Sequence, residues 1–197
     1  MTLEKDALAK VGVRRGISPA RDAFVPTGFL RLDQCLEGGG WPMGVLTELR
    51  TQQTGIGELR LLMPVLVPLS QKARVLWVAP PYKPYAPALA AHGMDLDHLL
   101  VVRPKTHGEA LWTVSQGLLS PSIAIVVGWF TGMRENEFRA LARQASEGGR
   151  LSFCFLPDDR VSRPSRLRLV LQSTASGIRI IPTRKAARPL APFVVAP

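Results

Sequence analysis

The chain has 197 residues, 46% of them hydrophobic, and its 25 lysines and arginines outnumber its 15 acidic residues, for a formal net charge of +10 at pH 7. This length and apolar content suit one domain with a sizeable core, but hardly two. No apolar run reaches the ~18 residues that cross a bilayer, because Pro64 and Pro68 interrupt the longest one. We therefore expect a cytoplasmic protein with no membrane partner, whose charge favours a polyanion or an acidic protein surface.

The cysteines and histidines indicate neither a disulfide framework nor a metal site. Cys35 and Cys154 lie far apart without metal-type spacing, and His92, His98 and His107 are scattered. We expect two reduced core cysteines and no cofactor.

Composition divides the chain into three parts. Residues 1–25 mix charge and glycine with little periodicity, which predicts a mobile N-terminal arm. Residues 26–193 carry the periodic segments of one domain, and 194–197 form a tail. An amphipathic helical segment is expected at 29–36, before a glycine-rich turn.

Short apolar segments then alternate with helical patterns, which is typical of an α/β fold with a parallel sheet. The run at 123–127 is the most continuous and is expected at the centre of the sheet. Two segments at 167–171 and 178–181 alternate polar with apolar residues and predict an antiparallel hairpin at the sheet edge. The other expected strands are 45–49, 75–79, 99–102 and 151–156, and the expected helices are 59–69, a segment ending at 91, 108–119 and 134–147.

The segment 48–60, ELRTQQTGIGELR, has the strand, loop and helix order of a phosphate-binding loop but not its residues. The pattern G-x-x-x-x-G-K-[ST] needs a lysine on the outer phosphates and a hydroxyl on magnesium. With Gly57 as the second glycine, Gln52 replaces the first glycine, Glu58 the lysine and Leu59 the hydroxyl. A carboxylate at the lysine position repels a triphosphate, so we expect no ATP turnover. The alternative is that Gly55 and Gly57 only form a turn.

Several segments carry a family resemblance. Residues 27–33, 38–44, 93–100 and 167–193 resemble segments of the RecA-like ATPase core, whereas 38–60 and 80–90 resemble more closely the ImuA family of translesion-synthesis accessory proteins. The stretch from 126 to 148 is similar to the SulA family. The resemblance implies a RecA-like three-layer core with a mixed, centrally parallel sheet and a C-terminal antiparallel hairpin.

The chain departs from the RecA pattern where the chemistry is done. Gly128 stands where the magnesium aspartate would follow the central strand, and the run 79–81, Ala-Pro-Pro, stands where the catalytic glutamate would be. Without the lysine, the metal ligand and the water-activating carboxylate, ATP hydrolysis has no machinery. This pattern predicts a pseudo-ATPase that is not an enzyme.

The ImuA resemblance implies an adaptor in SOS-induced, error-prone translesion DNA synthesis. Its expected partners are an ImuB-like Y-family polymerase homologue and an error-prone polymerase, with RecA and nonspecific DNA as further candidates. The alternative is a SulA-type cell division inhibitor that binds FtsZ. A working ATPase with an unusual loop is a third interpretation.

Two groups of basic residues are candidates for contact with a partner or DNA. The first surrounds a proline-bounded loop after a core strand, where open α/β sheets usually bind ligands; the second lies near the C-terminus. A solvated edge of a basic protein would carry the same residues. The candidates are Arg160, Arg163, Arg166 and Arg168 in the first group, and Arg184, Lys185 and Arg188 in the second.

The aromatic residues have a separate interpretation. The four tryptophans are expected mainly in the core, with Trp129 a candidate for the surface because it follows a strand end. Tyr82 and Tyr85, which flank Lys83, are candidates for stacking on bases or for docking a peptide.

Overall fold

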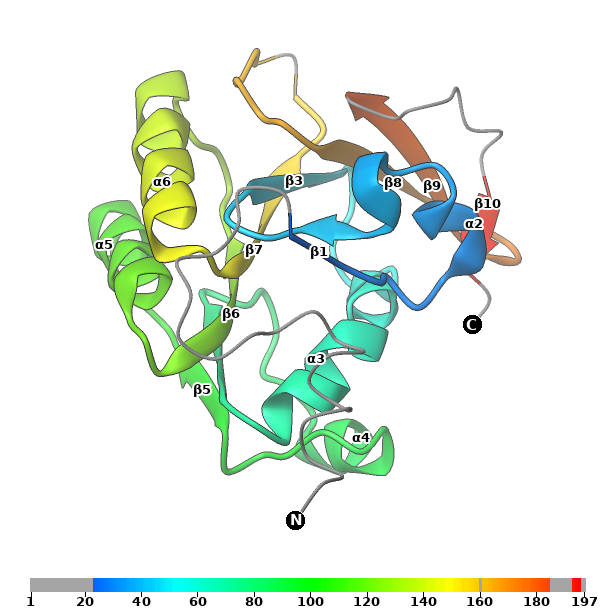
Figure 1. Cartoon of the computed structure of the whole chain (residues 1–197), viewed down its shortest axis with the longest axis horizontal. Helices are drawn as coiled ribbons and strands as arrows, with labels where there is room; N and C mark the ends of the chain where they lie inside the picture. The colour runs from blue at the N-terminus through cyan, green and yellow to red at the C-terminus, as the bar shows by residue number, and fades with distance from the viewer. Residues whose placement is uncertain (1–22, 160, 185–192, 196–197) are drawn as a thin grey trace.

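The computed structural model describes residues 23–159, 161–184 and 193–195. Within these ranges the chain forms an eight-stranded mixed sheet, in the order β10-β9-β8-β3-β7-β6-β4-β5, and a separate two-stranded ribbon of β1 and β2. Strands β8, β3, β7, β6, β4 and β5 are parallel to one another, and β9 and β10 continue the sheet in antiparallel order (Figure 1). The strands are β1 (Phe24–Val25), β2 (Trp41–Pro42), β3 (Leu46–Thr51), β4 (Arg74–Val78), β5 (Leu99–Val102), β6 (Ile123–Trp129), β7 (Leu151–Pro157), β8 (Arg168–Thr174), β9 (Gly177–Arg184) and β10 (Phe193–Val195).

Helices cover both faces of the sheet. The α-helices are α2 (Leu30–Asp33), α3 (Met63–Ser70), α4 (Ala86–Ala91), α5 (His107–Leu119) and α6 (Glu135–Gly148), with short 3-10 helices η1 (Glu37–Gly39) and η2 (Glu58–Leu61). In Figure 1, α5 and α6 lie together on one side of the sheet, and α3 and α4 lie on the other. The expected α/β class with a mostly parallel sheet and an antiparallel hairpin is confirmed at this level.

Each face of the sheet has its own core, because successive strand residues point to opposite faces. On β3, Leu49 packs in the core under α3, whereas Leu46 packs in the core under α5 and α6. Strand β6 is buried along nearly its whole length, as the apolar run at 123–127 predicts. Glycines also set how closely the helices approach: a Cβ at Gly148 of α6 would overlap the Leu118 carbonyl of α5.

The C-terminal hairpin lies differently from the expectation. Strand β8 pairs in parallel with β3 on one side and antiparallel with β9 on the other, so it is an interior strand. Strand β9 is flanked in turn by β10. The hairpin therefore lies one strand in from the edge, which β10 forms, because sequence alternation alone does not reveal which segment will pair with the outer strand.

The expected helix at 59–69, in which Pro64 predicts a kink or a new start near Arg60, is divided. Residues 58–61 form η2, and α3 begins only at Met63, so Pro64 lies in the first turn of α3. A proline there costs no helical hydrogen bond, because the first N–H groups of a helix have no partner within it.

The N-terminal boundary of the domain begins earlier than the expected residue 26, since Phe24 and Val25 pair with Pro42 and Trp41. The rest of the expected arm, residues 1–22, and the tail residues 196–197 lie outside the described ranges.

Two tryptophans differ from the expectation. Trp129 is buried, whereas Trp112 on α5 is 65% exposed. Cys154 is buried and Cys35 is partly exposed, and they are not joined by a disulfide. Among the described residues no helix is long and apolar enough to cross a membrane, and no group of His, Cys, Asp and Glu side chains is arranged to hold a metal ion.

Candidate functional site

A cavity of about 630 Å³ lies at the carboxyl ends of β3, β4, β6 and β7. Open α/β sheets bind ligands at this edge, because the loops that leave parallel strands meet there. The cavity is lined by Thr51, Gln52, Gln53, Thr54, Ala79, Pro81, Pro104, Lys105, Thr106, His107, Ala110, Trp129, Phe130, Thr131, Phe155, Leu156 and Pro157.

Aromatic rings form the floor of the cavity. The ring of Trp129 stacks on Phe155, with centroids 5.2 Å apart and planes at 14°, because the two residues are register partners on β6 and β7. Trp77 meets Trp129 edge-on, with centroids 5.8 Å apart. Phe130 is held by a backbone hydrogen bond from its N–H to the Phe155 carbonyl, 3.0 Å. The floor is therefore a closely packed apolar surface.

Gly128 makes this floor possible. A Cβ at Gly128 would come 2.8 Å from Cε2 of Phe130 and 3.1 Å from Cγ2 of Val114. The space where a strand-end acid would project is filled by these apolar side chains. An acid at position 128 would have to displace the Phe130 ring.

Polar residues on loops form the rim. Thr106 caps α5 by accepting a hydrogen bond from the Glu109 N–H at 3.1 Å, and Glu109 Oε2 accepts from the N–H groups of Lys105 and Thr106 at 2.7 and 3.3 Å. These contacts are a capping box, which satisfies backbone donors at the start of the helix. The rim therefore presents the side chains of Lys105 and His107 rather than a free helix N-terminus.

Ala79 follows β4 at the cavity wall with φ of 54°, in the left-handed region that alanine rarely adopts. Its N–H is held by the Val102 carbonyl at 2.8 Å. Backbone strain of this kind clusters at functional sites. The strained Ala79 lies at the carboxyl edge of the sheet, where the cavity is found.

The loop after β3 folds around its own carboxylate. Glu58 is 5% exposed, and its Oε1 accepts a hydrogen bond from the Gly55 N–H at 3.3 Å. Gly57 adopts a left-handed conformation, with φ of 87°, to start η2. The helix that starts at this loop is the short 3-10 helix η2, and α3 begins only at Met63. Gln52, the residue at the first glycine position, is exposed on the cavity rim, and Leu59 is partly buried against the core.

Beside the cavity, a buried ionic cluster centres on Glu48 of β3. Its carboxylate accepts hydrogen bonds from Nε of Arg50 at 2.8 Å, from an NH group of Arg163 at 3.2 Å and from Nε of Arg168 at 2.7 Å. The Glu48 and Arg163 side chains are fully buried. Charged groups are buried in this way only when they are paired.

The cluster fixes the segment between β7 and β8. Arg163 holds Asp159 through two hydrogen bonds of 2.9 and 2.7 Å and donates to the Met133 carbonyl at 2.8 Å. Arg50 donates to the Asp159 and Val161 carbonyls at 2.6 and 2.7 Å. The loops that follow β6 and β7 are thereby tied to the centre of the sheet.

The pKa values of the carboxyl groups follow these contacts. Burial acts to raise the pKa of Glu48, but the side-chain contacts with Ser165, Arg168 and Arg50 outweigh burial, so the pKa is lowered. The Arg163 guanidinium lowers the pKa of Asp159. Burial likewise opposes the hydrogen bonds that Glu137 accepts from Arg134 and His107, and its pKa falls to about 2. All three groups are carboxylates at neutral pH.

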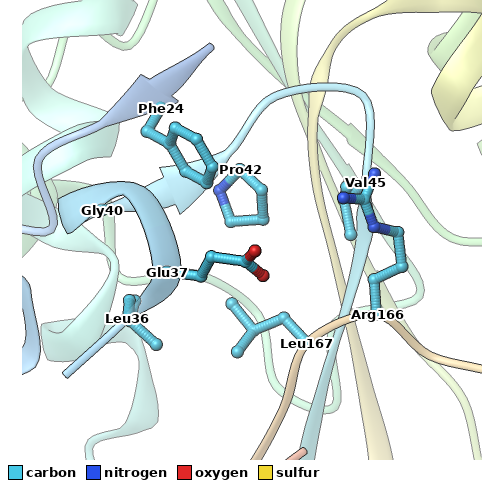
Figure 2. A pocket seen from close by; sticks show the side chains of 8 residues that line it. All are labelled: Phe24, Leu36, Glu37, Gly40, Pro42, Val45, Arg166 and Leu167. Atoms are coloured by element: carbon cyan, nitrogen blue, oxygen red, sulfur yellow. The ribbon is translucent and has the colours of Figure 1, made fainter. Parts of the chain in front are cut away.

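The first group of candidate arginines is divided by the structure. Arg163 and Arg168 belong to the buried cluster, so their role is to hold the fold rather than to present charge at the surface. Arg166 is exposed and lies away from the cavity, beside a small pocket of about 30 Å³ near the start of β3. Figure 2 shows the Arg166 side chain next to Val45 and the Glu37 carboxylate turned toward Leu167.

The remaining candidates cannot be placed in the same way. Arg160, Lys185 and Arg188 lie outside the described residues, and Arg184 is described only as the last residue of β9. Tyr82 and Tyr85 are 61% and 72% exposed. The hydroxyl of Tyr82 lies 3.5 Å from Oγ1 of Thr54 on the cavity rim.

Sequence reasoning missed the buried cluster and the cavity floor. The available signal for the cluster was the pair Glu48 and Arg50 within an otherwise apolar strand, since two charges in a buried strand require partners. Nothing local in the sequence points to the floor, because Trp129, Phe130 and Phe155 come from two strands that meet only in the sheet.

Comparisons with known proteins agree on one family. The family model described as "Cell division inhibitor SulA" matches residues 44–152. Among curated proteins, the chain is 28% identical to cell division inhibitor SulA of Klebsiella aerogenes over 127 residues, which cover 62% of this chain and 75% of that protein. It is 29% identical to SulA of Edwardsiella piscicida over 100 residues, covering 50% and 60%. The crystal structure of SulA from Pseudomonas aeruginosa aligns with a TM-score of 0.47 at 23% identity, covering 55% of this chain and 95% of that one.

These matches correct the interpretation drawn from the ImuA resemblance. The family model and the curated relatives are SulA proteins, so a translesion-synthesis adaptor, its partners ImuB, error-prone polymerase, RecA and DNA, and the description as a pseudo-ATPase are not supported. The SulA-like stretch at 126–148 was the informative part of the sequence. It covers the second half of β6 and all of α6, and the family model matches both elements together with β3 and the loop after it. Because the family model matches more than half of this chain, the chain belongs to the SulA family of cell division inhibitors.

Proposed function

We propose that this protein inhibits cell division by binding FtsZ and preventing its polymerisation, and that it catalyses no reaction. The observation that carries the proposal is the family match over residues 44–152, which includes Trp129 and Phe130 of the cavity floor and most of the rim, whereas Phe155 lies just beyond it. The relatives from Klebsiella aerogenes and Shigella flexneri are named as cell division inhibitors. An inhibitor of this kind acts by occupying a surface of its partner, so its effect depends on its amount.

The geometry of the loop supports the non-enzymatic part of the proposal. Glu58 occupies the interior of the loop, and a negative charge there opposes a nucleotide phosphate. The Phe130 ring fills the space beside Gly128. We infer that the segment 52–59 shapes the edge of the sheet and does not hold phosphates.

The architecture of the core is part of the same proposal. Parallel strands with helices on both faces, and a loop that leaves the interior strand β3, support a RecA-like description. We propose that residues 26–193 form one domain, to which Phe24 and Val25 also contribute through β1. Of the candidate arginines, Arg166 remains a proposed contact for an acidic surface, because its side chain is exposed.

The experiment is FtsZ assembly with GTP, followed by light scattering and sedimentation at increasing ratios of the protein to FtsZ. We expect the polymer yield to fall in proportion to the added protein and to be unaffected by ATP. Bovine serum albumin at the same concentrations controls for nonspecific effects. Undiminished polymer at a molar excess of the protein would show that it does not inhibit FtsZ.

A further inference from the structure

The cavity at the carboxyl edge of the sheet has the volume and the lining of a small-molecule site. Its volume of about 630 Å³ falls within the range of roughly 300–1,000 Å³ that ligand pockets occupy. Pro81, Pro104 and Pro157 stand around the aromatic floor, at or just after the ends of β4, β5 and β7. A proline ring fixes the backbone φ, so these walls have little freedom to change shape. The cavity is therefore largely formed before a ligand binds.

The side chains that can recognise a ligand lie on the rim of the cavity. Gln52, Gln53 and Thr131 are exposed, and their amides and hydroxyl make no hydrogen bond to the residues that the structure describes. Thr51 and Thr106 are already engaged, because the Thr51 hydroxyl donates to the Gln53 carbonyl at 2.6 Å and the Thr106 hydroxyl caps α5. Each glutamine amide offers two N–H donors and one carbonyl acceptor. The rim therefore suits a ligand that carries both acceptors and donors along one edge.

The charges at the rim favour an uncharged ligand. Aspartate and glutamate are absent from the described residues that line the cavity, so a cationic ligand finds no counter-ion there. Lys105 lines the cavity, but the exposed Glu109 carboxylate accepts a hydrogen bond from the backbone N–H of Lys105 at 2.7 Å and offsets its positive charge. In the neighbouring loop, the Glu58 carboxylate opposes phosphate groups.

We propose that this cavity binds an uncharged planar heteroaromatic compound of the nucleoside class, with its ring against the apolar floor and its polar edge at Gln52, Gln53 and Thr131. A flat ring buries apolar surface on the floor, and its ring nitrogens, carbonyls and amino groups are the acceptors and donors that glutamine amides match. A purely apolar molecule gains nothing from these amides, and a nucleoside triphosphate brings negative charge toward Glu58. Binding of FtsZ is a separate property of the protein, so either proposal can fail while the other stands.

Titration of the protein with adenosine, guanosine, cytidine and uridine tests the ligand class. The indole N–H signals in proton–nitrogen correlation spectra are the readout, with the Trp129 signal assigned from Trp129→Phe. We expect at least one nucleoside to shift the Trp129 signal with a Kd of about 1 mM or lower, and to leave the signal of the exposed Trp112 in place. The absence of saturable binding by all four nucleosides would overturn the site.

Two comparison ligands test the recognition of an uncharged polar edge. ATP and indole should each bind more weakly than the best nucleoside, because ATP adds negative charge and indole lacks most of the polar edge. Tighter binding of ATP would show that the site selects phosphates, and equal binding of indole would show that the rim takes no part. Either result would overturn the proposed class.

Four variants locate the bound ligand. Thr131→Trp fills the mouth of the cavity and should weaken nucleoside binding by about tenfold or more, and Gln53→Ala removes an amide and should weaken it by about three- to tenfold. Ser122→Trp and Gln116→Ala are the matched controls, because both residues are exposed and lie outside the cavity lining, and they should stay within about twofold of the wild type. Circular dichroism and thermal melting establish that all four are folded. Wild-type affinity in both Thr131→Trp and Gln53→Ala would place the ligand elsewhere and overturn the proposal.

Discussion

The carboxylate of Glu58 accepts a hydrogen bond from the backbone N–H of Gly55, three residues earlier in the same loop, with 3.3 Å between Oε1 and the nitrogen. Oε2 of the same carboxylate is buried and has no hydrogen-bond partner among the residues that the structure describes. The side chain thus holds the loop closed from inside, at the cost of one unsatisfied oxygen. Denaturation experiments can measure whether the Gly55 hydrogen bond stabilises the fold by more than the unsatisfied oxygen destabilises it.

Substitution of Glu58 tests the hydrogen bond between its carboxylate and the Gly55 N–H. We expect Glu58→Ala to lower the free energy of unfolding by about 1–2 kcal/mol, because the Gly55 N–H loses its acceptor. Glu58→Gln keeps an acceptor and should change it by less than ~1 kcal/mol. The measurement is urea denaturation followed by circular dichroism, with the exposed Glu147→Ala as the control. A Glu58→Ala variant more stable than the wild type would show that the buried carboxylate lowers the free energy of unfolding.

Glu48 tests the buried ionic cluster. Glu48→Ala leaves Arg50, Arg163 and Arg168 without their shared carboxylate, and an uncompensated buried charge costs about 3–5 kcal/mol. Glu135→Ala breaks an exposed ion pair with Arg139 and should cost less than ~1 kcal/mol. Denaturant unfolding of the two variants gives the comparison directly. Equal losses in both would mean that the cluster contributes no more than a surface pair.

Two helical glycines should respond to alanine with opposite signs. A Cβ at Gly148 overlaps the Leu118 carbonyl, so Gly148→Ala forces α5 and α6 apart and should cost about 2 kcal/mol or more. Nothing lies within 4 Å of a Cβ at Gly108 in the first turn of α5, and Gly108→Ala should gain up to about 1 kcal/mol from helix propensity. Thermal melting followed by circular dichroism separates the two. An unchanged or higher melting temperature in Gly148→Ala would contradict the close packing of these helices.

Acid should destabilise the protein through its lowered carboxyl pKa values. Glu48, Asp159 and Glu137 have lower pKa values folded than unfolded, with that of Glu137 falling from 4.5 to about 2. Their contribution is fully present above the unfolded pKa and is lost as the pH falls from about 5 toward 2, with a slope of at most ~1.4 kcal/mol per pH unit for each group.

Urea denaturation at a series of pH values measures this slope. Glu137→Gln removes one titrating group, so its stability should fall less steeply than that of the wild type below pH ~4.5. Parallel curves for the two proteins would show that Glu137 is not stabilised as a carboxylate.

The regular elements could be predicted closely where local pattern and packing agree. The apolar run at 123–127 became β6, the pattern at 134–147 became α6 within a residue at each end, and Gly149 ends α6 in a left-handed conformation with φ of 63°. The position of each strand within the sheet was harder to predict from the sequence. The hairpin was expected at the edge, yet β10 pairs with β9 and forms the edge strand, because the alternation of one strand does not encode which segment will pair with it.

The sequence by itself determined the α/β class, the alternation of strands and helices, the basic character and a loop that lacks the residues of phosphate chemistry, since each of these follows from residue type and spacing. Only the tertiary structure decided that Glu48, Arg163 and Arg168 share one buried cluster and that Trp129 and Phe155 form the floor of a cavity. The physical reason is that burial and charge pairing depend on which distant segments become neighbours. The same arginine is a surface contact or a structural ion according to the carboxylate that the fold places beside it.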